Sequence, residues 1–243
     1  MPHRISESFD KRDVAGIVSA FKDQETMVDS FVSTGRLEVE DETSRWGFDA
    51  LIIGERNPLR IKIEVTHAWG RPVVHCLISE DKMLVLYFPD KTIYSGRPGR
   101  PSSSPFFFDR MELSQLWGLL RGFPVLPKGA LSFISEGPGI IPLDKEGRAL
   151  QRIKIDAETL VPRSVNDEAL GLETVYPGFE DRKGILYAEK RWLKDLKNNN
   201  KIRLSSKKIS FNQPLPEAVF DLKIPHDFRE MPLDRLDRFS PFK

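Results

Sequence analysis

The chain has a single cysteine and only four histidines in 243 residues. With Cys76 alone, no disulfide can form within the chain. Because Cys76 lies in an apolar run, we predict a small buried hydrophobe rather than a nucleophile. None of the histidines has a second histidine, cysteine or carboxylate at metal-ligand spacing, and no HExxH or CxxC motif occurs. The usual sequence signs of a metal or cofactor site are therefore missing, and we expect none.

The sequence also lacks an excess of charge of one sign, clusters of glycine and long apolar runs. Lysine plus arginine (37) balance aspartate plus glutamate (36), so no overall field favours nucleic acid. The scattered glycines form neither a dinucleotide fingerprint nor a phosphate loop, and no G-x-S-x-G elbow is present. No signal peptide or transmembrane run is visible. These absences leave a cytoplasmic protein or an envelope protein without its leader as alternatives.

One stretch is nevertheless strongly basic. Ten basic residues and two acidic ones, Glu189 and Asp195, lie between Arg182 and Lys208. Solvated strand faces and a turn explain such a run in the ordinary way. A contact for anionic lipid headgroups or for an acidic partner is the alternative.

The most informative stretch runs from Arg45 to Gly96, where short alternating runs follow one another with turn residues between them. In Leu59–Thr66 every second residue is aliphatic, which predicts a strand with one buried and one wet face. The short connections predict hairpins, hence an antiparallel meander. The predicted strands of this part are Phe31–Glu40, Thr43–Ile53, Leu59–His67, Val73–Ser79, Met83–Phe88 and Thr92–Gly96.

Two segments have helical periodicity. From Asp13 to Val28 the apolar residues follow helical spacing on one side. A second helix follows Asp109 and Glu112, which are spaced like a capping box, and Gly122 is its predicted stop. Each helix needs a surface on which to bury its stripe.

The last third returns to strands at Gln151–Asp156, Leu160–Asn166, Gly171–Tyr176, Gly184–Lys190, Lys201–Phe211 and Val219–Ile224. No composition break divides the chain. We therefore predict a single domain over residues 1–243, with a core at about 13–225 and less order at both ends.

No constellation of catalytic residues is evident. Strand-borne acids such as Glu38, Asp49 and Glu64 occupy the polar phase of their strands, which predicts solvent exposure and ordinary acidity. We therefore expect no enzyme. A hydrolase that assembles such carboxylates remains an alternative, and it would need a polar concave pocket.

Two apolar features lie in predicted loops. Trp69 is at a strand-to-strand turn, where it either folds back onto its own sheet or enters a bilayer interface, an environment that favours amphipathic rings. Phe106, Phe107 and Phe108 end a Pro/Gly/Ser-rich loop. They either staple the following helix to the core or form a hydrophobic lid.

A characteristic series of segments consists of the first helix, Gly35–Val39, Arg45–Ala50, Pro58–Ile63 and Gly70–Val73, and at the other end Asn212–Pro225. This series resembles the LolA/LolB-like superfamily of periplasmic lipoprotein carriers and outer-membrane receptors. The resemblance implies an α+β, mainly β fold: a half-open, strongly curved antiparallel β-barrel with helices covering its concave face. It also implies an apolar cavity that takes acyl chains, and Trp69 matches the membrane-contacting loop position of the receptor branch.

From the residues and the resemblance together we predict a non-catalytic protein that binds lipid or an acylated lipoprotein for sorting or insertion in the bacterial envelope. We expect a monomer in the periplasm, anchored to the outer membrane as a lipoprotein, with Trp69 as a membrane-surface contact and no nucleic-acid partner. The predicted lipid-cavity residues are Ile17, Phe21, Leu59, Ile61, Ile63, Val65, Val85, Tyr87, Leu116, Trp117 and Leu120. The predicted lid is Phe106, Phe107 and Phe108. The alternative function is a protein-interaction or stress-sensing module on the same scaffold.

Overall fold

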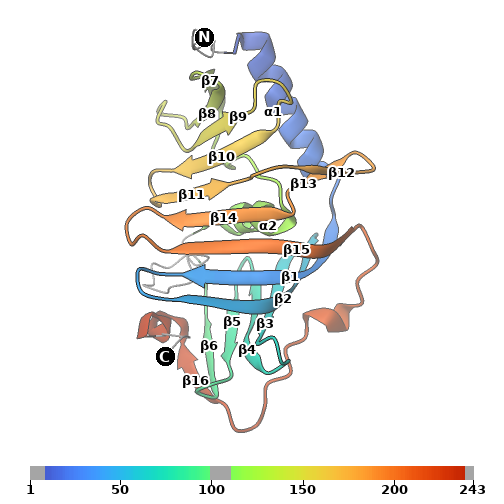
Figure 1. Ribbon diagram of the computed structural model, residues 1–243, viewed down its shortest axis with the longest axis vertical. Helices are drawn as coiled ribbons and strands as arrows, with labels where there is room; N and C mark the ends of the chain where they lie inside the picture. Colours follow the sequence, from blue (N-terminus) through green and yellow to red (C-terminus); the bar gives the residue numbers. More distant parts are fainter. Residues whose placement is uncertain (1–8, 99–110, 239–243) are drawn as a thin grey trace.

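A computed structural model describes residues 9–98 and 111–238 of the chain. Its dominant element is a fourteen-stranded sheet with the strand order β16-β6-β5-β4-β3-β2-β1-β15-β14-β11-β10-β9-β8-β7 (Figure 1). The strands are β1 (Ser30–Glu40), β2 (Arg45–Arg56), β3 (Leu59–Thr66), β4 (Pro72–Ser79), β5 (Met83–Tyr87), β6 (Thr92–Gly96), β7 (Ser132–Ser135), β8 (Gly139–Leu143), β9 (Arg152–Ile155), β10 (Pro162–Asp167), β11 (Leu172–Val175), β14 (Lys190–Asp195), β15 (Lys201–Phe211) and β16 (Arg229–Pro232). A separate hairpin is formed by β12 (Glu180–Arg182) and β13 (Ile185–Tyr187).

The predicted antiparallel meander is confirmed from β1 to β6, where each strand pairs with the next. β1 also pairs with β15, which joins the two halves of the chain into one sheet. Gly35 lies at an irregularity in that pairing, so close to the Ser205 carbonyl that a Cβ would overlap it. A residue without a side chain is therefore required where the two halves meet.

The first helix, α1 (Lys11–Thr26), begins with a capping box in which Asp10 accepts from the backbone N–H of Asp13 at 2.9 Å. It buries a single stripe, Val14, Ile17 and Phe21. Helical spacing places these residues on one face, and the opposite face is in solvent. The predicted amphipathic helix is thus confirmed.

The second helix, α2 (Leu113–Arg121), ends at Gly122 with φ of +92°, as its sequence predicts. Its capping box is shifted from the predicted one: Glu112 is the N-cap and pairs with Gln115, while Asp109 lies outside the described residues. Seven of its residues are buried, from Ser114 and Leu116 to Arg121.

Five strands of the described residues escaped the sequence analysis: β7, β8, β12, β14 and β16. β7 and β8 follow a glycine- and proline-containing stretch that shows no clear alternation. In β14 the inward positions are Arg191, Leu193 and Asp195, whereas Trp192 is more exposed. Two charged residues on the buried face hide the alternation on which the prediction relied.

The predicted strand Val219–Ile224 is wrong. A short 3₁₀ helix, η2 (Glu217–Phe220), occupies its first part, and the prolines that flank the segment disfavour a strand. Phe220 is buried there beneath the guanidinium of Arg60, which lies 3.9 Å from the ring centre.

The expectation of little order after Pro225 also fails for the described residues. β16 pairs in parallel with β6, and the 3₁₀ helix η3 (Leu233–Arg238) follows it. Leu233 and Leu236 are buried in the core. Since two spaced leucines in a charged segment form no recognisable period, this docking was invisible in the sequence.

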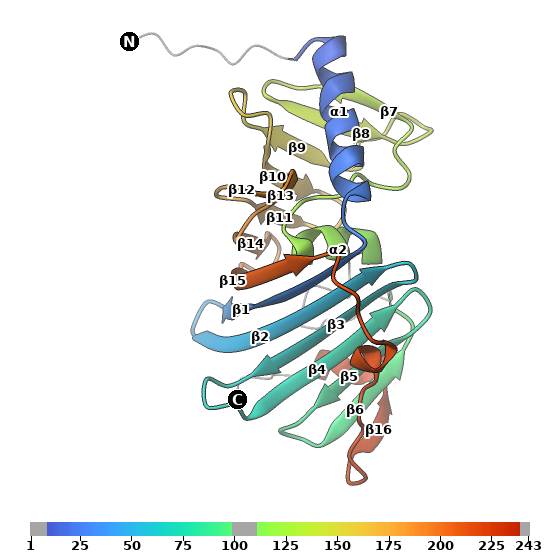
Figure 2. The same cartoon turned by 90° about the vertical axis from the view of Figure 1, so that its right-hand side faces the viewer.

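The hydrophobic core consists of two clusters. The α2 cluster packs α2 against β1 to β6, β11, β14 and β15. The α1 cluster packs α1 against β8, β9, β10 and the segment around Phe123. Figure 2 shows α1 beside β7 to β9 and α2 beside the middle of the sheet.

Candidate functional site

The residues predicted to line one cavity are divided between the two clusters. Those in the α2 cluster are Ile61, Ile63, Val65, Val85, Tyr87, Leu116, Trp117 and Leu120, with the partly buried Leu59 packed against them. Ile17 and Phe21 belong to the α1 cluster. The structure therefore brings α2 together with the predicted strand residues but places the α1 stripe elsewhere.

Packing in the α2 cluster is close. Phe31 and Trp117 meet edge to face with ring centres 5.0 Å apart. A Cβ on Gly54 would overlap Phe31 and lie 2.7 Å from the indole of Trp117, so this glycine makes room for the helix. α2 thus lies directly against the sheet.

The α1 cluster, in contrast, borders an open apolar groove. The groove lies between α1 and the edge strand β7 and has a volume of about 650 Å³. Its lining consists of Phe9, Lys11, Val14, Ala15, Val18, Ser19, Lys22, Phe133, Ile134 and Ser135. Ligand pockets commonly measure about 300–1,000 Å³, so the groove has the size of a binding site.

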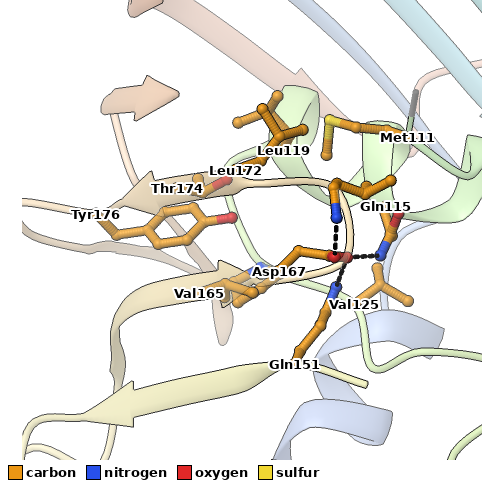
Figure 3. A pocket seen from close by; sticks show the side chains of 12 residues that line it. Met111, Gln115, Leu119, Val125, Gln151, Val165, Asp167, Leu172, Thr174 and Tyr176 are labelled. Carbon is orange, nitrogen blue, oxygen red and sulfur yellow. Dashed lines mark hydrogen bonds between the residues drawn. The ribbon is translucent and has the colours of Figure 1, made fainter. Parts of the chain in front are cut away.

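A second, much smaller cavity lies beside α2 (Figure 3). Asp167 accepts from Gln115 at 3.2 Å and from Gln151 at 3.5 Å, and Tyr176 faces the same space. The volume of about 30 Å³ holds two or three water molecules, on the scale where about 10–15 Å³ holds one. It is too small for an acyl chain.

Two arginines that the sequence analysis did not single out are completely buried. Arg191 donates to the carbonyl oxygens of Leu120 (3.0 Å) and Ala188 (2.8 Å) and to the Ser206 hydroxyl (2.9 Å). Through Leu120 it satisfies the C-terminal end of α2.

Arg121 differs from Arg191 in its partners. It is 0% exposed, and its Nε, Nη1 and Nη2 atoms have no hydrogen-bond acceptor. Burial lowers the pKa of this guanidinium to about 10, so that it remains charged at neutral pH. A signal was present in the sequence: Arg121 follows Trp117 by four positions and so places a charge on the apolar stripe of the helix.

Trp69 lies at the β3–β4 turn and is 76% exposed. Its ring stacks on His67, with ring centres 4.5 Å apart, and His67 in turn contacts Phe48. Contact of this exposed indole with a membrane surface stays a prediction. The predicted lid, Phe106 to Phe108, lies outside the described residues.

Several charges of the basic run are neutralised by acids on neighbouring strands. Lys194 pairs with Glu173 at 2.8 Å, and Arg203 pairs with Glu40 at 2.7 Å. Arg182 instead donates to the Ile209 carbonyl. Since the cross-strand acids were not visible in the linear count, the run is less basic in the fold than in the sequence.

Two features of the described residues concern metal binding and nucleophilic chemistry. No group of three or more His, Cys, Asp or Glu residues that could hold a metal ion occurs among them. Cys76 is free and buried, as predicted, and burial raises the pKa of its thiol to about 12. A thiol of that pKa is protonated at neutral pH and is a poor nucleophile.

No model of a known protein family and no curated protein matches the sequence. Solved structures do match the fold. A domain from Vibrio parahaemolyticus, described as an outer membrane lipoprotein-sorting domain, has a TM-score of 0.59 and 12% identity, covering 84% of this chain and 95% of its own. A DUF1329 family protein from Desulfovibrio piger has a TM-score of 0.58 and 12% identity, covering 86% of this chain and 97% of its own.

A LolA superfamily protein from Nitrosomonas europaea also matches, with a TM-score of 0.53, 14% identity, and coverage of 86% of this chain and 97% of its own. Within the described part of the chain, neither helix has the length and apolar character needed to cross a membrane. The chain has two α-helices on a large, mainly antiparallel sheet within its described residues, and it superimposes on these structures over most of their length. Its fold is therefore LolA/LolB-like.

Proposed function

We propose that this protein is a non-catalytic carrier or receptor that binds a lipid, or the acyl chains of a lipoprotein, in the bacterial envelope. The observation that carries this proposal is the apolar groove between α1 and β7. The solved structures of the same fold include a protein described as a lipoprotein-sorting domain, which supports the same function. In this proposal the sheet of the present chain forms the curved wall of a half-open barrel, and the helices cover that wall.

The dimensions of the groove suit an acyl chain. It extends along α1 from Lys11 to Lys22, which at 1.5 Å per residue is about 17 Å. One leaflet of a bilayer whose hydrocarbon core is about 30 Å thick gives each acyl chain about 15 Å. A single chain therefore has room to lie along the helix.

The chemistry of the groove is also suitable. Phe9, Val14, Val18 and Phe133 pack with the α1 cluster and present apolar surface to the groove. Burial of an acyl chain is favourable by about 0.8 kcal/mol per CH₂ group, so binding needs no catalytic group. We propose that a longer ligand extends the site toward the α2 residues Leu116, Trp117 and Leu120 and their strand partners.

The setting that we propose is the periplasm, with a monomer anchored to the outer membrane as a lipoprotein. Trp69 then contacts the membrane surface, because its exposed indole has the amphipathic character that is favoured at bilayer interfaces. Phe106 to Phe108 are proposed as the lid.

A matched pair of variants tests the groove. Ala15 and Ala20 are both exposed on α1, but only Ala15 lines the groove. Ala15→Asp should weaken binding of a neutral fluorescent monoacylglycerol at least tenfold, because it places a charge against the chain. Ala20→Asp should leave the affinity within a factor of two.

The measurement is a fluorescence titration of delipidated full-length protein, supported by native mass spectrometry of protein isolated from bacterial membranes. A wild-type protein that carries no lipid and binds no acyl probe would refute the proposed function. Equal loss in both alanine variants would place the acyl chain elsewhere.

A further inference from the structure

The starting observation is the contrast between the two buried arginines. Arg191 donates to carbonyl and hydroxyl oxygens and so has an evident structural role at the end of α2. Arg121 has five N–H donors and no acceptor for any of them. Its guanidinium lies over the ring of Phe123, 5.1 Å from the ring centre. That contact offsets only part of the cost of burying a charge.

No carboxylate within the described residues neutralises Arg121. The acid that acts on it most strongly is Glu25, near the end of α1. Glu25 is already held by Arg56, with a carboxylate contact of 3.5 Å to Nη2 and a 2.5 Å hydrogen bond from Nη1 to the Glu25 carbonyl. The negative end of the α2 dipole favours a nearby cation, yet it supplies no acceptor to this guanidinium. Arg121 is therefore a buried cation without an ion-pair partner among the described residues.

The position of Arg121 shows which kind of anion would fit. It lies where the two clusters meet, because Leu120 belongs to the α2 cluster and Phe123 to the α1 cluster. Phe123 packs edge to face on Phe21 of α1, at 5.2 Å, and the α1 cluster continues from there to the groove. The buried side chains of Phe21 and Phe123 lie between the groove and Arg121. The part of a ligand that spans this distance must therefore be apolar, and a ligand that also carries an anion is an amphiphile.

We propose that Arg121 receives the anionic group of this amphiphile, a carboxylate or a phosphate ester, while the acyl chain extends along α1 toward the groove. Guanidinium binds both groups through two parallel N–H···O bonds, which Lys cannot reproduce. The inference rests on the proposed function and adds to it the chemical class of the ligand. It assigns the residue that distinguishes a charged lipid from a neutral one.

The test compares oleate with methyl oleate, which share a chain and differ in charge, on delipidated full-length protein. A charge-assisted hydrogen-bonded contact predicts that the wild type binds oleate about 10- to 100-fold more tightly. Arg121→Met should abolish that preference and leave the affinity for methyl oleate unchanged. Dodecyl phosphate and dodecanoate, titrated side by side, identify whether phosphate or carboxylate is preferred, and a preference for either over dodecanol supports the proposal.

Two further variants serve as controls. Arg12→Met removes an exposed cation of α1 that does not line the groove, and it should leave the oleate preference intact. The melting temperature of the ligand-free protein gives an independent readout: Arg121→Met should raise it, because an uncompensated buried charge is removed, whereas Arg191→Met should lower it.

The outcomes separate the two proposals. Binding of oleate and methyl oleate with equal affinity, or a preference that survives Arg121→Met or disappears with Arg12→Met, overturns the role of Arg121 while the acyl-binding function stands. Binding of neither ligand overturns both. A lower melting temperature of ligand-free Arg121→Met would show that Arg121 has an internal partner, and it also overturns the role.

Discussion

The two helices of this protein bury apolar surface in opposite ways. α2 is buried on nearly all of its faces and fits into the sheet beside Gly54. α1 buries one stripe only, and its neighbouring face borders the groove along β7. α2 is therefore part of the hydrophobic core, whereas α1 lies over one end of the sheet and contacts it through a single stripe. A protein of this fold can thus keep a stable core and still offer an apolar surface to a ligand.

The largest expected effect falls on the core helix. Leu120→Ala should lower the free energy of unfolding by about 2–5 kcal/mol, because it leaves a cavity at a fully buried position. Urea denaturation measures the change, with the exposed Leu131→Ala as a control that should stay within about 0.5 kcal/mol. A loss below 1 kcal/mol for Leu120→Ala would remove the distinction between the helices.

Replacement of glycine by alanine should change the free energy of unfolding in opposite directions in the two regions. Gly54→Ala should cost about 1–3 kcal/mol, because its methyl group would overlap Phe31 and Trp117. Gly16 lies within α1 with nothing within 4 Å of its Cβ position, so Gly16→Ala should stabilise the protein by about 0.5–1 kcal/mol. Thermal denaturation compares the two variants. Stability changes of the same sign would contradict the distinction between the tightly packed α2 and the more open α1.

The half of the sheet that contacts α1 should depend on pH through Asp156, in the β9–β10 connection. Hydrogen bonds from Arg163 and then Thr159 hold the pKa of this carboxyl below its ordinary value of 3.8. A lowered pKa in the folded state stabilises the fold above the ordinary value, and this stability is lost as pH falls through the folded pKa. Wild type should therefore progressively lose its advantage over Asp156→Asn as the pH falls below about 4.

Melting temperatures of both proteins across that range measure the effect. A difference between wild type and Asp156→Asn that stays constant across that range would refute the pH dependence.

The smallest effect on stability is expected at Trp69. Trp69→Glu should change the free energy of unfolding by no more than about 0.5 kcal/mol, since the side chain is mostly in solvent. It should weaken association with liposomes, because it removes the interfacial indole. Co-sedimentation with liposomes checks this, and unchanged association would assign Trp69 to its stack on His67.

Much of the fold was predictable wherever one periodicity dominated. The alternation of β3, the stripe of α1 and the glycine stop of α2 each report local geometry that repeats every two or 3.6 residues. The prediction failed where the buried face carries charge, as in β14, and where proline-flanked residues imitate a strand, as at Phe220. In those segments tertiary packing, not local pattern, selects the structure.

The candidate site was less predictable than the fold. The groove requires β7 beside α1, two segments that are more than a hundred residues apart and joined only by packing. The sequence could show that the α1 and α2 stripes must be buried, but not that they enter different clusters, because periodicity specifies a face and not its partner.

The amino-acid sequence by itself determined the two amphipathic helices, the antiparallel meander and the absence of a recognisable catalytic motif, since each follows from local spacing and residue type. Tertiary structure alone decided the pairing of β1 with β15, the open groove along α1 and the burial of Arg121 without an acceptor. These features depend on which distant segments meet, and free energy of packing, summed over the whole chain, determines that choice.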